Sequence, residues 1–181
     1  MNNYVCLNIQ SFINNRGATS SNNYQQGELS LGKSSLPEEE FPKDLRFTFN
    51  NVPFQFYRSE QGDNIEMEGQ TLEFSPLSAS KVHFLGVSSN GDMFDNIYFL
   101  NNTEVIHTGK LYLSDFVSEL PAFQDQCALC FSYLNTRGGK RDHIKPKLWY
   151  SYIELPQLKT INKIRLEDNP FIHIFAITFE S

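Results

Sequence analysis

Two cysteines in a Cys-x-x-Cys sequence, Cys127 and Cys130, have a spacing that could do chemistry. Thiolates paired in this way are common zinc ligands. The surrounding residues, however, predict a strand over 127–134, and side chains three positions apart on a regular strand point to opposite faces. The chain also has no second cysteine pair and no histidine at ligand spacing. We therefore interpret both residues as structural thiols rather than metal ligands.

A nucleophilic serine is the next chemistry to consider. Residues 86–91 read Gly-Val-Ser-Ser-Asn-Gly, which has neither the spacing nor the strand-to-helix context of a Gly-x-Ser-x-Gly nucleophile elbow. This segment instead predicts a hairpin turn. The four histidines are scattered and match no metal-binding pattern. His83 and His173 fall inside apolar segments, which is typical of hydrogen-bonded core imidazoles.

Paired carboxylates could indicate glycoside hydrolysis, which needs two carboxyl groups flanking the scissile bond. Glu66 and Glu68 share one face of an expected strand, about 7 Å apart by strand rise, and Asp92 and Asp95 are a second pair. Two carboxylates on one strand cannot flank a bond by themselves, and an exposed polar face explains them equally well. The sequence therefore predicts that the protein is not an enzyme. A β-sandwich hydrolase or lyase is the alternative that a convergent Asp, His and Arg set would favour.

Two more groups of polar residues are compatible with ligand binding. Glu28, Asp92 and Asp95 offer the oxygen ligands that calcium prefers, but their spacing matches no known calcium loop. We predict no cofactor, with a structural calcium ion as the alternative. Residues 137–143 read Arg-Gly-Gly-Lys-Arg-Asp-His. This basic loop could grip a phosphate, a carboxylate or an acidic partner, or it could be a solvated hairpin.

Composition excludes several classes of protein. The 181 residues fit one domain, 1–181, and the net charge of −6 lacks the basic footprint of a nucleic-acid-binding protein. No stretch approaches the roughly 18 apolar residues of a membrane helix, and the N-terminus shows no signal peptide. Three cysteines do not make a disulfide framework. We therefore expect a cytoplasmic protein with neither a nucleic-acid nor a membrane partner.

Short apolar runs separated by turn signals predict an all-β protein. Residues 4–9 are the first expected strand, and a long polar loop with little regular structure follows over 10–44. The other expected strands lie near 45–49, 52–57, 64–67, 71–74, 81–88, 95–100, 104–114, 127–134, 147–154, 161–166 and 171–180. No segment keeps a helical period for three turns. This pattern predicts a β-sandwich jelly roll of about ten strands with little helix.

Several short motifs occur in an order that resembles a known family. They begin with Leu-Asn-Ile-Gln-Ser-Phe-Ile-Asn-Asn-Arg-Gly over 7–17. The later motifs are Leu36-Pro37, Val52-Pro53-Phe54, Asp63-Asn64-Ile65, Gly69-Gln70-Thr71-Leu72, Phe84-Leu85-Gly86, Leu113-Ser114-Asp115-Phe116, Leu148-Trp149 and the closing residues 173–178. Together they cover nearly the whole chain and are similar to β-sandwich modules attached to glycoside hydrolases, which have the galactose-binding jelly-roll fold.

The resemblance implies a function as well as a fold. It implies a non-catalytic module that binds a carbohydrate or accompanies a glycosidase. The family's Phe-Asp-Gly in the polar loop is replaced here by Leu29-Ser30-Leu31, so the acidic residue of that loop is missing. The alternative is therefore an intracellular β-sandwich that has lost sugar binding and acts as an interaction scaffold for a protein partner.

A ligand site can be placed by following the strands from pole to pole of the sandwich. If strands alternate in direction, the loops at 10–44, 58–63, 75–80, 101–103, 135–146 and 167–170 gather at one pole. Planar polar groups and an aromatic platform are what a sugar needs. The predicted ligand-binding residues are Arg16, Tyr24, Arg58, Arg137, Asp142, His143 and Trp149. For Trp149, the single tryptophan, a place in the core is the alternative.

Overall fold

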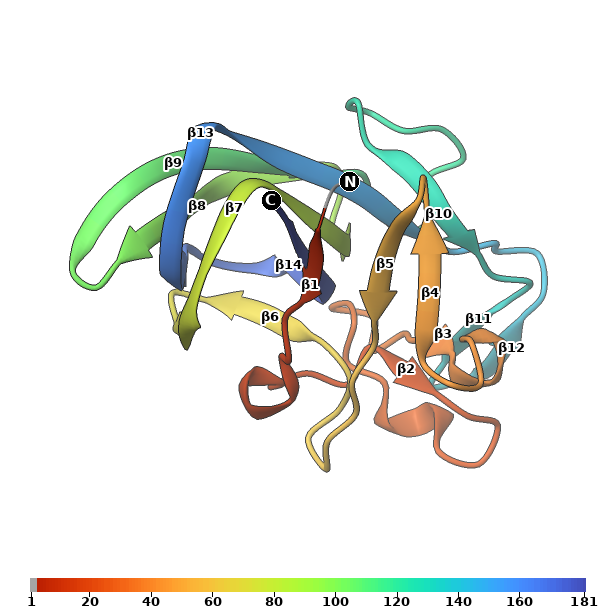
Figure 1. Ribbon diagram of the computed structural model, residues 1–181. Helices are drawn as coiled ribbons and strands as arrows, with labels where there is room; N and C mark the ends of the chain where they lie inside the picture. The colour runs from red at the N-terminus through yellow and green to blue at the C-terminus, as the bar shows by residue number, and fades with distance from the viewer. Residues whose placement is uncertain (1–2) are drawn as a thin grey trace.

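Two long strands, β7 (Thr71–Ser88) and β13 (Lys147–Leu166), lie at the centre of the fold. The structure is a computed structural model, and it describes residues 3–181. Its main sheet has eight strands, all paired antiparallel (Figure 1). The other six are β1 (Tyr4–Cys6), β6 (Ile65–Glu68), β8 (Met93–Asn101), β9 (Glu104–Leu113), β10 (Gln126–Cys130) and β14 (Asp168–Glu180). The all-β fold expected from the sequence is confirmed.

Three small two-stranded sheets and three short 3₁₀ turns complete the fold. The sheets pair β2 (Ala18–Thr19) with β3 (Leu36–Pro37), β4 (Arg46–Phe49) with β5 (Val52–Gln55), and β11 (Leu134–Thr136) with β12 (Gly139–Arg141). The 3₁₀ turns are η1 (Gln10–Phe12), η2 (Tyr24–Gln26) and η3 (Glu38–Glu40). Within residues 3–181, no helix has the length and apolar character needed to cross a membrane.

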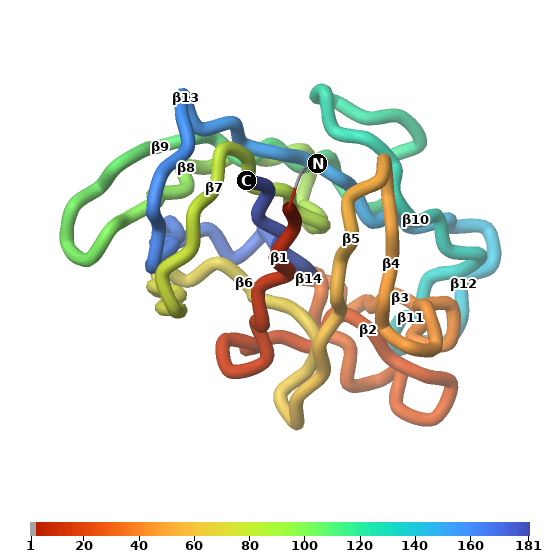
Figure 2. Tube along the Cα trace, in the orientation of Figure 1, coloured from red at the N-terminus to blue at the C-terminus, as the bar shows by residue number. Residues whose placement is uncertain are grey.

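The pairing of β7 with β13 corrects the expected strand pattern. The sequence predicts loops at 75–80 and 155–160, but the two segments are parts of continuous strands, and Ala79 pairs with Lys159. A register shift between Glu154 and Lys159 absorbs the polar and proline residues that resemble a turn. Both strands bend near these two segments, at the top of the view in Figure 2. Because each is one strand rather than two, the pole-to-pole alternation of loops that the sequence predicts is wrong.

An aromatic cluster joins segment 10–44 to the main sheet. The ring of Phe41 lies 5.2 Å from that of Phe56, 5.1 Å from that of Phe131 and 6.1 Å from that of Phe175 on β14, measured between centroids. These rings are at most 5% exposed. Segment 10–44 has little regular structure, yet it is packed against the main sheet, at the bottom of the view in Figure 1.

The hairpin between β4 and β5 follows from its turn residues. Asn50 and Asn51 both have positive φ, 50° and 63°, as a two-residue type I′ turn requires. Asparagine tolerates this left-handed conformation better than other side chains that carry a Cβ. The turn expected at these residues is confirmed.

Near its C-terminal end, β7 leaves no room for a side chain at Gly86. A Cβ added there would lie 2.7 Å from the carbonyl oxygen of His173 and 2.9 Å from Leu113 Cδ1. We expect Gly86→Ala to lower the free energy of unfolding by about 1–3 kcal/mol, because backbone atoms must move. Urea denaturation followed by tyrosine fluorescence measures this difference. Gly32→Ala is the control, since its nearest neighbour would be Ser30 Oγ at 3.6 Å; equal midpoints for the two variants would contradict the packing argument.

Candidate functional site

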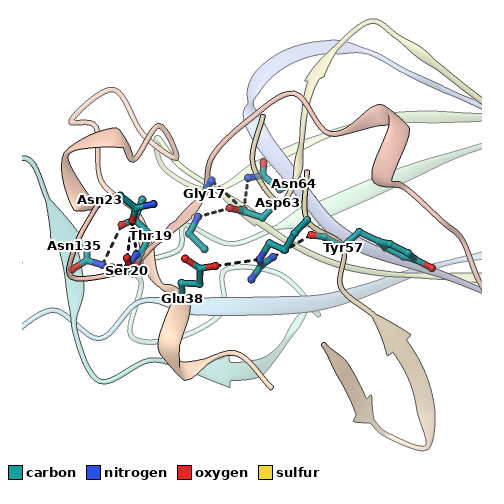
Figure 3. Close-up of polar contacts among 11 residues, drawn as sticks. Gly17, Thr19, Ser20, Asn23, Glu38, Tyr57, Asp63, Asn64 and Asn135 are labelled. Atoms are coloured by element: carbon teal, nitrogen blue, oxygen red, sulfur yellow. Dashed lines mark hydrogen bonds and ion pairs between the residues drawn. The ribbon is translucent and has the colours of Figure 1, made fainter. Parts of the chain in front are cut away.

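The end of the molecule formed by segment 10–44 is organised around a buried carboxylate, Asp63 (Figure 3). Asp63 Oδ1 accepts hydrogen bonds from Gly17 N at 3.1 Å and from Asn64 Nδ2 at 3.0 Å, and Oδ2 accepts one from Ala18 N at 3.0 Å. Asp63 is 2% exposed. Its oxygens satisfy buried backbone donors that have no partner in a sheet, which fixes this irregular part of the chain.

Arg58 lies near the same carboxylate and connects it to η3. Its Nη1 donates to Tyr57 O at 3.2 Å, and its Nε lies 3.8 Å from Glu38 Oε1. The guanidinium also lies over the ring of Phe41, 4.9 Å from the centroid. Its Nη2 is buried and has no hydrogen-bond partner within the described part of the chain. Arg58 is thus engaged largely by the protein's own groups.

Two more predicted ligand-binding residues, Arg16 and Tyr24, lie at this end. Arg16 Nη1 donates to Gln26 Oε1 at 2.9 Å, and Nη2 donates to Glu60 O at 2.7 Å. Tyr24 belongs to η2, which contacts β11. Arg16 and Arg58 therefore hold the loops around them in place. Tyr24 differs from them, because its hydroxyl accepts a hydrogen bond from the exposed side chain of its neighbour Gln25.

The β11–β12 hairpin joins the same end through backbone pairing. Ser35 and Asn135 exchange two backbone hydrogen bonds of 3.0 Å each, and Asn135 Nδ2 donates to Thr19 O at 2.9 Å (Figure 3). The segments that carry six of the predicted residues therefore lie at the same end of the molecule (Figure 1), although the loop parity that led to the prediction is wrong. These residues are Arg16, Tyr24, Arg58, Arg137, Asp142 and His143.

The predicted residues of the hairpin are exposed. Asp142 pairs with Lys140, with Oδ1 and Nζ 3.0 Å apart, and the same Nζ lies 4.0 Å from the centroid of the Tyr133 ring. Arg137 and His143 are exposed as well. This surface therefore carries charged side chains of both signs.

Trp149, the seventh predicted residue, lies in the core. It is 1% exposed, and its Nε1 donates to Asp115 O at 3.0 Å. The ring fills the space between β13 and the segment after β9, so it presents no face to a ligand.

The carboxylates considered for acid–base chemistry anchor the N-terminal segment instead. Glu66 Oε2 accepts a hydrogen bond from Asn15 Nδ2 at 2.8 Å, and Glu68 Oε2 accepts one from Asn14 Nδ2 at 3.0 Å. Partial burial raises the pKa of Glu66, and the neighbouring Glu68 raises it further. Both side chains come from β6 and point the same way, as expected, but they hold the protein together.

The oxygen ligands considered for calcium do not converge. Glu28 pairs with Lys33 at 3.3 Å, and Asp95 Oδ2 accepts a hydrogen bond from Asn169 Nδ2 at 3.1 Å. Asp92 Oδ1 accepts one from the backbone of Asp115 at 2.9 Å. Across residues 3–181, no three histidine, cysteine, aspartate or glutamate side chains are grouped so that they could hold a metal ion.

An open hollow of about 890 Å³ lies elsewhere, between β9, β13 and the segment that leads into β10. Its size is within the range of ordinary ligand pockets. Its lining comes from Lys110, Tyr112, Ala122, Phe123, Gln124, Asp125, Gln126, Ser151 and Tyr152. None of these residues is among those predicted from the sequence.

Tyr112 and Phe123 line one side of the hollow, and Phe94 packs against both of them. The ring centroids of Tyr112 and Phe123 are 5.2 Å apart, and Phe94 lies 5.2 Å from Tyr112. Phe94 is 49% exposed and Tyr112 is 37% exposed, so apolar ring surface faces the solvent here. Lys110 Nζ lies over the Phe94 ring, 4.8 Å from its centroid. We call Phe94, Tyr112 and Phe123 the aromatic rim.

Hydrogen bonds to Asp125 hold the loop that carries Phe123 in place. Asp125 Oδ2 accepts from Ser114 N at 2.7 Å, and Oδ1 accepts from Ser114 Oγ at 2.9 Å. Ser114 Oγ in turn accepts from Ala122 N at 2.8 Å, and Gln126 Oε1 accepts from Asn50 Nδ2 at 2.9 Å. The loop before β10 is therefore preorganised although it has no regular secondary structure.

A buried chain of polar side chains lies close to Tyr152, which lines the hollow. His83 Nδ1 is 2.9 Å from Tyr150 Oη, and His83 Nε2 is 2.7 Å from Glu180 Oε2. Burial lowers the pKa of His83 and raises that of Tyr150 to about 12. At neutral pH both groups are therefore uncharged, and Tyr150 is only 6% exposed. This arrangement ties β7, β13 and β14 together and keeps the tyrosine protonated.

A family model for the AziU2-like beta-sandwich domain matches residues 3–181. The chain belongs to this family. The match covers all of the described residues, and the β-sandwich that it denotes agrees with the all-β, antiparallel main sheet. A search of curated proteins found no match.

In this AziU2-like β-sandwich, sequence reasoning missed the hollow because its residues come from three separate segments. One signal was present: Phe94 and Tyr112 are cross-strand partners on β8 and β9. An aromatic pair on the outer face of a hairpin is unusual unless a partner covers it. Phe123 gave no such signal, since the loop that carries it is placed by the Ser114–Asp125 hydrogen bonds.

His173, on β14 of the main sheet, contacts Asn64, which donates a hydrogen bond to the buried carboxylate of Asp63. His173 is 1% exposed, with Nδ1 3.1 Å from Asn64 Oδ1 and Nε2 3.3 Å from Ser89 Oγ. Burial lowers the pKa of His173 to about 3. The imidazole is therefore neutral in the folded protein and bonds through both ring nitrogens, as the sequence predicts for a core histidine.

The pKa of His173 predicts acid sensitivity. An unfolded histidine takes up a proton near pH 6.5, whereas the folded one resists protonation until about pH 3. The free energy of unfolding should thus be independent of this group above pH 6.5 and fall as the pH decreases toward 3, by up to about 1.4 kcal/mol per pH unit. Urea midpoints at pH 7.5, 6 and 5 measure the slope. His173→Gln should flatten it relative to His143→Gln, which removes an exposed imidazole; equal slopes would refute the assignment.

Proposed function

We propose that this AziU2-like β-sandwich domain is a non-catalytic binding module whose hollow takes a carbohydrate. The observation that carries the proposal is the aromatic rim, in which Tyr112 and Phe123 line the hollow and Phe94 packs within 6.4 Å of both rings. The apolar C–H faces of sugar rings stack on such side chains. An exposed aromatic group of this kind is uncommon on a surface that binds nothing.

Polar groups on the other walls suit the hydroxyl groups of a sugar. Gln124, Gln126 and Ser151 line the hollow together with the ammonium of Lys110, whereas the Asp125 carboxylate is occupied by Ser114. Amide groups are planar and carry a donor and an acceptor, so they can engage neighbouring hydroxyls in pairs. The hydrogen bonds that fix Asp125 reduce the entropy that would be lost on binding.

The roles of the titratable groups near the hollow support a binding rather than a catalytic function. Asp125 is 4% exposed and both its oxygens accept hydrogen bonds from Ser114. Tyr150 and His83 are buried and uncharged at neutral pH, since burial raises the pKa of the first and lowers that of the second. A general acid or base has to reach the reacting atom.

The motif order described in the sequence supports the same class of ligand. It resembles modules of the galactose-binding type that accompany glycoside hydrolases. The acidic residue that those modules carry in the polar loop is replaced by Ser30. That loop lies at the bottom of the view in Figure 1, whereas β9 and the loop before β10 lie at the top. We therefore assign binding to the hollow rather than to the loop end.

Removing the rim should abolish binding. We expect a panel of mono- and oligosaccharides, titrated by protein-observed NMR, to shift signals of β9 and of the loop before β10. Tyr112→Ala or Phe123→Ala should lower the affinity about tenfold, because each deletes a stacking surface. Val105→Ala, on the same strand and 42% exposed, is the matched control.

The location of the shifts decides between the two ends of the molecule. Shifts confined to the β11–β12 hairpin, lost in Arg137→Ala, would place the ligand at the loop end and overturn the assignment to the hollow. A flat response across the panel in a folded protein, judged from an unchanged melting temperature, would refute carbohydrate binding.

A protein partner is the second candidate, and two exposed side chains favour it. Leu120 is 78% exposed and Val117 is 41% exposed, and both lie on the segment that leads to the hollow. If a peptide occupies the hollow, Leu120→Ser should weaken its capture severalfold, whereas sugar binding should be insensitive to this change. The paired comparison separates the two functions.

A further inference from the structure

The β10–β13 ladder contains a one-residue β-bulge, and this bulge lies within the Cys-x-x-Cys sequence. Cys127 pairs with Trp149 and Leu129 with Leu148, so two steps along β10 match one step along β13. Cys130 then pairs with Lys147. Ala128 is the extra residue, a feature that local sequence does not announce.

The bulge turns the two cysteines to the same face. Residues directly opposite each other on antiparallel strands point to one side of the sheet, and residues two apart on β13 share a face. Trp149 and Lys147 do so here, since Lys147 Nζ lies 5.9 Å from the centroid of the tryptophan ring. Cys127 and Cys130 must follow their partners. The expectation that these side chains point to opposite faces, which is correct for a regular strand, is therefore wrong here.

The bulge also shortens the distance between the two cysteines. Three residues of regular strand span about 10 Å, whereas the two residues of β13 that they oppose span about 6.6 Å. Disulfides join Cα atoms that are about 4.4–6.8 Å apart. The side chain of Cys127 leans along the strand in the right direction, because its Sγ contacts Leu129 O at 3.5 Å.

The two thiols are close enough to interact electrostatically. Partial burial raises the pKa of Cys127, the nearby Cys130 raises it further, and the ammonium of Lys147 opposes both effects. Cys127 and Cys130 are exposed and free. Cys6 differs from them, since it is half-buried on β1 with its Sγ 3.4 Å from Pro53 O.

We propose that Cys127 and Cys130 form a reversible disulfide by exchange with a small-molecule disulfide such as glutathione disulfide. One thiolate attacks a sulfur of glutathione disulfide, forms a mixed disulfide and releases one glutathione. The second cysteine then attacks the protein-bound sulfur, closes the intramolecular disulfide and releases the second glutathione. Two protein thiols are oxidised, one glutathione disulfide is reduced, and the two thiol protons end on the two glutathiones.

The unpaired bulge residue makes closure compatible with the sheet. Ala128 has no partner on β13, so drawing the cysteines together moves a residue outside the ladder. The flanking pairs, Gln126 with Tyr150 and Cys130 with Lys147, remain in register. The site is thus a dithiol presented on a rigid support.

Redox titration tests the proposal directly. The full chain carrying Cys6→Ser is equilibrated in glutathione buffers of graded oxidation, alkylated, and analysed by intact mass and by mapping of the peptide that contains both cysteines. We expect a species that has lost two hydrogens and carries no glutathione. Under the same buffers Cys127→Ser and Cys130→Ser should each carry one glutathione adduct, because no second thiol can displace it.

The unfolded chain provides the decisive control, since any Cys-x-x-Cys can close when it is flexible. We expect the native pair to be half-oxidised at a glutathione disulfide to glutathione ratio about tenfold lower than the same chain in urea, because the bulge presents the thiols together. A native pair that is oxidised less readily than the unfolded one, or that accumulates two glutathione adducts, would show that the fold holds the cysteines apart and would overturn the proposal.

Discussion

The antiparallel pairing of β7 with β13 is the constraint on which the rest of the structure depends. The ladder runs from Trp149 opposite Gly86 to Arg165 opposite Thr71. β14 joins the free edge of β7, while β10 and β8 join the two ends of β13 on its other edge. β9 is then carried by β8. The hollow between β9, β13 and the loop before β10 is a product of this arrangement, because β8 and β10 occupy different lengths of the same strand.

Buried hydrogen-bonding side chains explain how the polar segment 10–44 can pack against the main sheet. The residues of 10–44 form only the two-residue strands β2 and β3, yet Leu29 and Leu36 are fully buried. Burying such a segment would leave backbone donors unpaired. Asp63 and Asn135 accept or donate the bonds that a sheet would otherwise supply. The stability of this end thus depends on a few side chains rather than on a ladder.

Local rules of sequence predicted those parts of the fold that depend on near neighbours. Alternation of apolar residues located most strands, and Asn50-Asn51 located the type I′ hairpin. The same rules failed where partner strands decide the outcome. Segments 75–80 and 155–160 look like loops one by one, and they are strands because they pair with each other. The bulge at Ala128 likewise exists only in relation to β13.

The candidate site was harder to predict than the fold. The polar loops correctly indicated segments that lie at one end of the molecule. Arg16 and Arg58, however, donate hydrogen bonds to acceptors of the protein itself. The hollow depends on side chains of ordinary strand residues, such as Tyr112, that become exposed because nothing covers them. Exposure is a property of the assembled molecule, so composition and motif spacing carry little information about it.

The two ends of the described chain lie side by side (Figure 2). Asn3 and Ser181 exchange two backbone hydrogen bonds, of 3.2 Å and 3.0 Å, and β1 continues this pairing along β14. A polypeptide that enters and leaves at one point can be inserted into a surface loop of a host protein without stretching that loop. By the same geometry, a short peptide could join the ends while new ones are opened at the turn after β8, which would give a circular permutant with the same sheet order.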